Sequence, residues 1–529
     1  MKKRLLSIFL ILTVFGSLFC AGMPAAQAAG TEAARLTPTL EYAGFRNTVR
    51  ATDGDNGTYA AGETGATVRI TAAEEIGLVY LCYQKAPGTW IASSAAARTE
   101  QGKDAFLHET VDVAAGHGNV KEITLQFPAG VELASLTVYG KGELPADVQA
   151  WQPPCEQADL MLLSAHSDDE QLFFAGIIPY YAQVRGARVQ VVFFTEHPAD
   201  STRWHERLDS LWASGCRNYP VVSPFPAAVS YNKADAYKAF ATAGFTEAKI
   251  VDWLALQVRT FRPFAVVTHS LTGERDEGQH MAAADAMTKA AARAADASFV
   301  TEGKAAYDLP KLYLRAYAQN PIVLNQMDTP SDKLGGKTPF LVSQTAYLAY
   351  SSRVSAATAA ASTANRRFYG TAQPLAHPEQ ITVTKASQIT TDALLSFGLY
   401  RKGEGVADDV LKNDFLENMT VPPAETTEIA AQPQPPETSV PPADTSVPTG
   451  TPTGTGTPAT AAPTSPSGST AGQTVPDAPG RDDSGNFPPL SYEKTHSFLW
   501  IGISAALGLA ALGFVLCYGI RKIRHCNNR

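Results

Sequence analysis

The densest group of chemically active side chains in the sequence follows a short apolar run. Leu160 to Leu163 are apolar, and His166, Asp168 and Asp169 come directly after them. An imidazole and a carboxylate three positions apart on one tight turn can bind the same metal ion. A second carboxylate beside them can act as a general base. The stretch therefore predicts a metal site with its own base, and a solvated acidic turn is the alternative.

The apolar run has the length and composition of a buried strand in a parallel sheet. Open α/β sheets bind their ligands at the carboxyl ends of strands, which is where His166 would lie. Strand-like and helix-like stretches alternate after it, at 189–195, 202–215, 264–270 and 281–295. This alternation predicts an α/β fold for residues 155–324, with three layers and a Rossmann-like, mostly parallel sheet.

The flanking regions have a different pattern. Residues 30–154 contain short stretches rich in β-branched and aromatic residues, separated by Gly, Pro and Asn, and these predict an all-β sandwich. The clearest of these stretches are 66–71, 78–83 and 123–127. Residues 325–419 contain a helix-like stretch at 356–364 and a strand-like stretch at 397–400. We interpret them as a C-terminal extension of the α/β domain.

Both ends of the chain carry membrane-targeting patterns. A basic start, an apolar run and small residues predict a signal peptide over residues 1–29, cleaved near Ala28. Residues 498–520 are uncharged and apolar, which is long enough for a transmembrane helix. The basic residues within 521–529 predict a cytoplasmic tail. We therefore expect a single-pass protein of the cell membrane, with its N-terminal ectodomain outside the cell.

Composition defines the remaining segments and excludes some partners. Residues 420–489 are dominated by Pro, Thr, Gly, Ala and Ser, which predicts a disordered linker. The formal net charge is −8 and no long basic block occurs, which argues against nucleic acid as a partner. Only Cys82, Cys155 and Cys216 would face the outside, and three scattered cysteines predict no disulfide framework.

Three motifs carry a resemblance to a known family. Ala165-His-Ser-Asp-Asp-Glu170 resembles the Ala-His-Pro-Asp-Asp-Glu signature of the PIG-L/LmbE-like de-N-acetylases. Two further blocks follow in the family's order, Arg203-x-x-Glu206 and Gly273-Glu-Arg-Asp-Glu-Gly-Gln-His280. The resemblance covers about residues 155–324. It implies a zinc hydrolase that removes acetyl groups from N-acetylglucosamine-type sugars.

The resemblance also implies roles for single residues. His166, Asp169 and His280 match the ligands of one Zn²⁺, and another divalent metal is the alternative. Asp168 matches the general base, and Arg203 matches an arginine that the family places near the substrate or the oxyanion. Such a metal can lower the pKa of its bound water toward about 7, which makes the water a nucleophile.

Glu277 departs from the family pattern. It replaces a histidine that helps to stabilise the tetrahedral intermediate in relatives. An ionised carboxylate would oppose that charge, and losing one such donor typically costs about 10²–10³ in turnover. Two neighbours could compensate, His269 and Arg275.

Two hypotheses follow from these motifs. The first is a cell-surface, zinc-dependent de-N-acetylase acting on an N-acetylated glycan. The second is a glycan-binding surface protein whose de-N-acetylase domain is degenerate and inactive. Ala51-Thr-Asp-Gly-Asp-Asn-Gly-Thr-Tyr59 resembles the discoidin-type (coagulation factor 5/8) family, as does the stretch 136–140. That resemblance implies sugar binding by the sandwich, whose alternative role is to pack against the next domain.

Overall fold

The computed structural model describes residues 31–419, except for residues 199, 302, 356–358, 371–381, 391–393, 405 and 407–412 and the side chains of 359–363. The predicted signal peptide, linker, membrane helix and cytoplasmic tail lie outside the described residues. Among the helices of the described part, none has the length and apolarity needed to cross a membrane.

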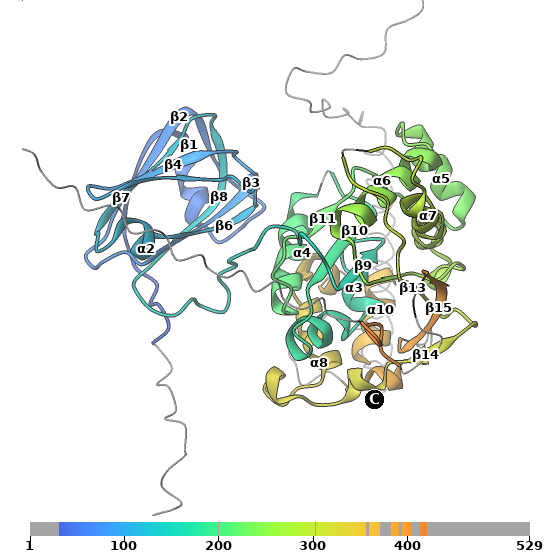
Figure 1. Ribbon diagram of the computed structural model, residues 1–529. Coiled ribbons are helices and arrows are strands. Elements are labelled where there is room, and N and C mark those ends of the chain that lie inside the picture. Colours follow the sequence, from blue (N-terminus) through green and yellow to red (C-terminus); the bar gives the residue numbers. More distant parts are fainter. Residues whose placement is uncertain are drawn as a thin grey trace, which may run out of the picture. The chain divides into compact units, whose positions relative to one another are not determined.

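Residues 31–148, called the β-domain below, form an antiparallel sheet in the order β5-β4-β7-β2-β8-β3-β6, with β1 paired to β2. Strand β2 pairs with β7 over Ala66–Thr71 and with β8 over Ala60–Gly62. The sheet folds over one large apolar core, and Figure 1 shows its strands in blue. The all-β character expected for this region is confirmed. Its strands are β1 (Thr39–Arg46), β2 (Ala60–Thr71), β3 (Leu78–Lys85), β4 (Trp90–Ser93), β5 (Arg98–Gln101), β6 (His108–Asp112), β7 (Glu122–Phe127) and β8 (Val131–Tyr139), with the helical turns η1 (Thr48–Thr52) and α2 (Val113–His117).

The second sheet has the order β11-β10-β9-β12-β13-β15-β14. The pairs from β11 to β13 are parallel, and β15 is antiparallel to both of its neighbours. The mostly parallel sheet predicted from the alternating pattern is therefore confirmed. The strands are β9 (Leu160–Ser164), β10 (Val189–Phe193), β11 (Val221–Val222), β12 (Ala265–Thr268), β13 (Lys311–Arg315), β14 (Pro321–Val323) and β15 (Ser396–Lys402).

Helices cover both faces of this sheet. Successive side chains of a strand point to opposite faces, so each buried strand contributes to two apolar cores. Leu160 and Leu162 of β9 pack into one apolar core, while Met161 and Leu163 pack into the other. The second core contains α5 (Lys233–Thr242), α6 (Glu247–Phe261) and α7 (Gly278–Ala295). The first contains α3 (Asp169–Leu172), the π-helical turn η2 (Pro179–Val184), α4 (Ser201–Ala213), α8 (Pro339–Tyr347), α9 (Ser351–Val354) and α10 (Ala359–Tyr369). Short 3₁₀ turns link these elements, namely η3 (Glu274–Asp276), η4 (Asn325–Asp328), η5 (Asp332–Leu334) and η7 (Ala386–Gln388).

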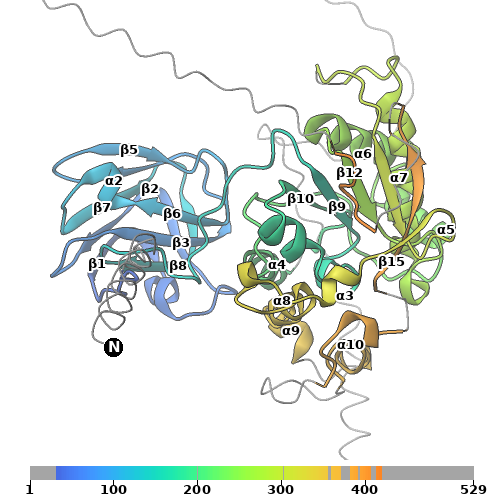
Figure 2. The same cartoon turned by 60° about the horizontal axis from the view of Figure 1, so that its bottom comes forward.

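The described residues between 325 and 419 belong to this same sheet and core. Strand β15, which contains the predicted strand 397–400, lies between β13 and β14. Helices α8 and α9 pack against α4, and α8 also packs against α3, as Figure 2 shows. The predicted helix at 356–364 overlaps α10, although residues 356–358 lie outside the described part. Cys82, Cys155 and Cys216 are free and buried, as the absence of a disulfide framework predicts.

Two buried histidines join the β-domain to helix α4. His108 Nε2 of β6 lies 2.7 Å from His205 Nδ1 of α4. Burial, assisted by the charge of Arg207, lowers the pKa of His205 to about 4. Burial and the neighbouring His205 hold the pKa of His108 well below its usual range. Both rings therefore stay neutral in the folded protein at pH values where free histidine is charged.

This contact predicts a loss of stability in mild acid. Below the ordinary histidine pKa of about 6.5, the unfolded chain binds a proton at residue 205 and the folded chain does not. The contribution of His205 to the free energy of unfolding is therefore complete above about pH 6.5 and falls by about 2 kcal/mol by about pH 5. Denaturant unfolding of the wild type and of His205→Gln at several pH values measures it, because their difference should shrink as the pH falls.

The comparison with His205→Gln is needed because a second buried group, Asp209, titrates in the same pH range. Burial raises the pKa of its carboxyl to about 6, so this group titrates in the same range with the opposite sign. Its contribution is common to both proteins and cancels in the difference. A difference that stays constant from pH 7 to pH 5 would show that His205 is not held neutral.

Candidate metal centre

The site lies where the strand order of the α/β sheet reverses. Strand β9 has β10 on one side and β12 on the other, and the chain leaves β9 and β12 at the same edge of the sheet. Such a switch point opens a crevice between the connections that follow the two strands. His166 follows β9 by two residues, and His280 lies in the first turn of α7, after β12. The sheet thus brings together two histidines that are 114 positions apart.

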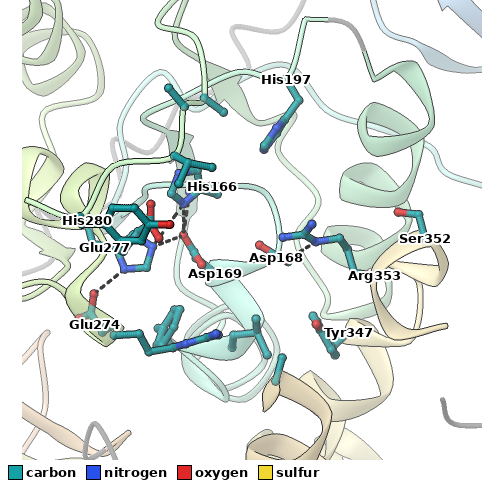
Figure 3. Close-up of a pocket in the computed structure, with 18 residues that line it drawn as sticks. His166, Asp168, Asp169, His197, Glu274, Glu277, His280, Tyr347, Ser352 and Arg353 are labelled. Carbon is teal, nitrogen blue, oxygen red and sulfur yellow. Dashed lines mark hydrogen bonds and ion pairs between the residues drawn. The ribbon is translucent and has the colours of Figure 1, made fainter. Parts of the chain in front are cut away.

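Three donor atoms converge in this crevice, as Figure 3 shows. Asp169 Oδ2 lies 2.9 Å from both His166 Nδ1 and His280 Nε2, and the two nitrogens are 3.3 Å apart. Two imidazole nitrogens and one carboxylate oxygen form the donor set of a catalytic zinc site, which keeps a further position for water. The structure therefore brings the three predicted ligands together in a set that fits a metal ion.

The hydrogen bonds around His166 leave the correct nitrogen available. Its Nε2 lies 2.9 Å from Gln279 Oε1. The same amide oxygen accepts from the Ala228 N–H, and Gln279 Nε2 donates to the Pro226 carbonyl. An oxygen that accepts cannot donate, so His166 must carry its proton on Nε2. The lone pair of Nδ1 then points to the other two ligands.

Glu274 has the equivalent role for His280. Its Oε2 lies 3.1 Å from His280 Nδ1, which favours the proton on that nitrogen and leaves Nε2 to the metal. Glu274 Oε2 also lies 2.6 Å from His269 Nδ1, and His269 Nε2 accepts from the Ala165 N–H. Since His269 Nδ1 must donate, the cluster of His269, Glu274 and His280 supports the ligands and is not a second metal site.

Gln279 offers a test of this ligand orientation. Replacing it with alanine removes the acceptor that fixes the proton of His166. Outer partners of metal-bound histidines typically contribute about 10–100-fold in metal affinity. We therefore expect Gln279→Ala to weaken zinc binding by about that factor, measured by competition with a chromophoric chelator. Gln171→Ala is the matched control, because Gln171 is also buried but its side chain makes no hydrogen bond with the residues that the structure describes. Equal losses in the two variants would contradict the assigned role.

The charges of the three donor residues depend on one another. Burial alone would raise the pKa of the Asp169 carboxyl, yet His280 and His166 hold it well below its usual range. Burial disfavours a charged His280, but Asp169 and Glu274 outweigh it and raise the pKa of this histidine to about 10. A metal ion and a proton therefore compete for the same ring, and metal binding releases the proton.

Asp168, the predicted base, lies beside the ligands on the same turn. Its φ of 110° is in the left-handed region, which asparagine and aspartate tolerate better than other side chains. Its Oδ2 lies 2.9 Å from Arg203 Nη2 and 3.3 Å from Arg353 Nε. Arg203 is only 2% exposed, so it lies behind Asp168 and is not among the residues that line the pocket.

Glu277 lies at the predicted position, directly before α7, and lines the pocket. Its side chain makes no hydrogen bond or ion pair with other described residues. The next position requires glycine, because a Cβ at Gly278 would lie 2.3 Å from the Asn232 carbonyl oxygen. Of the two possible compensating residues, Arg275 lines the pocket, whereas His269 is fully buried with both ring nitrogens occupied. His269 therefore cannot replace the missing histidine.

The centre opens into a pocket of about 670 Å³, a size typical of ligand sites. Its lining residues come from the turn after β9, the segment 274–280, the segments 227–231 and 347–353, and also include His197 and Ala364. The sequence motifs did not indicate the segments 227–231 and 347–353. Gln279, Glu274 and Arg353 were missed as well. Gln279 and Arg353 contact residues that are distant in the sequence, and the ion pair between Glu274 and His280 depends on how the turn before α7 folds.

Comparisons with known proteins give likenesses to parts of the chain. No family model and no curated protein matches it. Among solved structures, the conserved protein TT1542 from Thermus thermophilus is 16% identical, covers 46% of this chain and 96% of its own, and has a TM-score of 0.31. The A40926 pseudoaglycone deacetylase Dbv21 is 16% identical over 38% of this chain and 84% of its own, with a TM-score of 0.26. The N,N'-diacetylchitobiose deacetylase from Pyrococcus horikoshii is 13% identical over 37% of this chain and 73% of its own, with a TM-score of 0.24.

The chain is thus similar, in part and at low TM-score, to solved structures that include deacetylases. These likenesses carry no conclusion about its activity, which rests on the geometry of its own site. The discoidin-type resemblance of residues 51–59 stays a prediction.

Proposed function

We propose that the chain is a zinc-dependent de-N-acetylase that hydrolyses the acetamide of an N-acetylglucosamine-type glycan at the cell surface. The convergence of His166 Nδ1, Asp169 Oδ2 and His280 Nε2 beside a further carboxylate, Asp168, carries the proposal. A site of two histidines and one carboxylate, open to solvent on one side, is typical of hydrolytic metal centres.

The side chains divide the chemistry between them. Bound zinc would polarise the amide carbonyl and supply a water molecule of lowered pKa. Asp168, on the turn that also carries two of the ligands, takes the proton of the attacking water and later returns it to the leaving amine. Arg203, buried behind Asp168, pairs with this carboxylate and fixes its direction. Gln279 and Glu274 hold the two histidines in the required tautomers.

The substrate class and the location rest on further features. Tyr231 is 74% exposed on the pocket rim, where its ring can pack against the apolar face of a sugar. The surface location rests on the sequence patterns at residues 1–29 and 498–520. Together they suggest a substrate outside the cell, presented to a domain on a membrane anchor.

Metal analysis and an acetate assay test the proposal. We expect one zinc per chain in the purified full-length protein, and acetate release from N-acetylated oligosaccharides that stops when a chelator removes the metal. Restoring zinc should restore the release. A protein that binds no divalent metal after zinc loading would refute the proposal.

Glu277 favours a second candidate, a glycan-binding surface protein with an inactive domain. The pocket presents a carboxylate at the position where the family has a proton donor, and an ionised carboxylate opposes an oxyanion. Glu277→His decides between the two. If the site is an adapted enzyme, the wild type releases acetate and the variant is slower. If the site has decayed, the wild type retains glycan without acetate release, and the variant gains activity of up to about 10²–10³-fold over background.

A further inference from the structure

One wall of the pocket comes from the segment 347–353, which lies outside the region that carries the sequence motifs. Glu206 and Glu170, two carboxylates from those motifs, hold this segment in place. Glu206 accepts hydrogen bonds from Ser351 Oγ (3.0 Å), Ser352 N (2.6 Å) and Ser352 Oγ (2.6 Å). Glu170 Oε1 accepts from Tyr350 Oη at 2.7 Å. The start of α9 is therefore fixed to the turn after β9 and to α4.

This attachment places Arg353 in front of Asp168. Figure 3 shows the Arg353 side chain reaching Asp168 across the pocket from α9. Asp168 Oδ2 thus has two cationic partners, the buried Arg203 and Arg353, whose side chain is 53% exposed. The two arginines approach from different elements, α4 and α9. Arg203 also lies over the ring of Tyr350, 5.2 Å from its centroid, which connects the two partners through the same segment.

We propose that Arg353 is a positioning residue for the base Asp168, and that Glu206 acts through it by holding the segment 350–353. The inference rests on the proposed function, in which Asp168 takes a proton from water. Two arginines that bind Oδ2 of Asp168 from different directions restrict the rotation of the carboxylate. The other oxygen, Oδ1, then keeps a fixed orientation toward the attacking water. Small errors in the direction of a reacting group are costly in rate. The segment 325–419 then completes the active site and does not merely cover the sheet.

The first experiment separates turnover from binding. Arg353→Gln should lower kcat by about tenfold with KM changed less than threefold, because the base is misdirected while the substrate contacts remain. Arg353→Lys should recover part of the loss, since it restores the charge without the planar fork. Zinc content should stay at the wild-type value, and thermal unfolding should stay cooperative, which shows that the variant is folded. Arg366→Gln, an exposed arginine of α10 outside the pocket, is the matched control and should retain wild-type kinetics.

A second variant tests whether Glu206 acts through Arg353. Glu206→Ala removes the three acceptor contacts to Ser351 and Ser352 and should reproduce the fall in kcat. Combined with Arg353→Gln it should cost no more than either change alone, because both act through one contact. If the two changes lower kcat multiplicatively, Glu206 does not act through Arg353. A kcat of Arg353→Gln within twofold of the wild type would overturn the inference itself. So would a rise in KM at constant kcat, which would mark Arg353 as a substrate contact.

A stability measurement, which requires no catalytic activity, tests this inference independently of the proposed function. If the zinc-loaded wild type releases no acetate, the proposed function has failed, and the contact is then judged by denaturant unfolding. Arg353→Gln should change the unfolding midpoint in the wild-type background and leave it unchanged in the Asp168→Asn background. The same change in both backgrounds would show that Arg353 and Asp168 are not coupled, and would refute the positioning role.

Discussion

Replacing His280 with alanine should remove the bound metal and lower acetate release by at least about 10³-fold. His280 Nε2 is one of three donor atoms, and its loss leaves Asp169 and His166 with too few ligands for tight binding. A catalytic metal supplies several kcal/mol of transition-state stabilisation, and each 1.4 kcal/mol is about a factor of ten in rate. Zinc content by mass spectrometry and initial rates of acetate release measure the two effects.

Controls separate loss of the metal from loss of the fold. His280 is buried between Asp169 and Glu274, so alanine removes one partner from each of two buried carboxylates. His280→Gln keeps a polar side chain there and should also lose the metal while melting closer to the wild type. His197→Ala is the matched histidine control for metal content, because His197 lines the pocket but lies outside the donor set. Full zinc occupancy in His280→Ala would remove this residue from the ligands.

Asp168→Asn should have a different phenotype, with zinc retained and turnover lost. Asparagine has nearly the same shape but cannot take a proton from water, and a positioned general base contributes about 10²–10⁴ in rate. We expect kcat to fall by that factor at unchanged zinc stoichiometry. Rates on the zinc-saturated variant, corrected for residual metal-free protein, measure the effect.

The rate of Asp168→Asn also shows which carboxylate is the general base. Glu277 is another carboxylate that lines the pocket, and it has no partner among the residues described. If Asp168→Asn keeps more than about a tenth of the wild-type kcat, the base lies elsewhere, and Asp168 Oδ2 serves only to hold Arg203 and Arg353. Glu277→Gln would then become the variant that abolishes turnover.

The sequence was sufficient for the parts of the fold that depend on local patterns. Leu160 to Leu163 form a buried strand because an uninterrupted apolar run is stable only inside a covered parallel sheet. Strand β12 and helix α7 lie where the alternating pattern predicts them. Since parallel strands end at the same edge, the approach of His280 to His166 followed from that pattern together with the motifs.

The rest of the site depends on contacts that no local pattern encodes. Gln279 matters because a loop around Ala228 fixes its amide, and nothing in the sequence of α7 reveals that loop. Arg353 lies in a four-residue helix, in a region whose sequence pattern is too weak to predict a fold. Its role is visible only when Ser351 and Ser352 are seen to bind Glu206. His269 was misjudged for the same reason, since the hydrogen bond from Ala165 is set by the register of two strands.

Much of the pocket wall comes from segments that carry no metal donor, and this has a consequence for evolvability. The metal donors come from the turn after β9 and from α7, whereas two of the walls come from the separate segments 227–231 and 347–353. Within them, Val229 and Tyr231 are highly exposed and line the pocket, whereas Ala228 and Ser352 hold the residues that support the ligands and the base. For protein engineering, libraries confined to residues 229 and 231 should therefore vary substrate preference while leaving the donor atoms and Arg353 untouched.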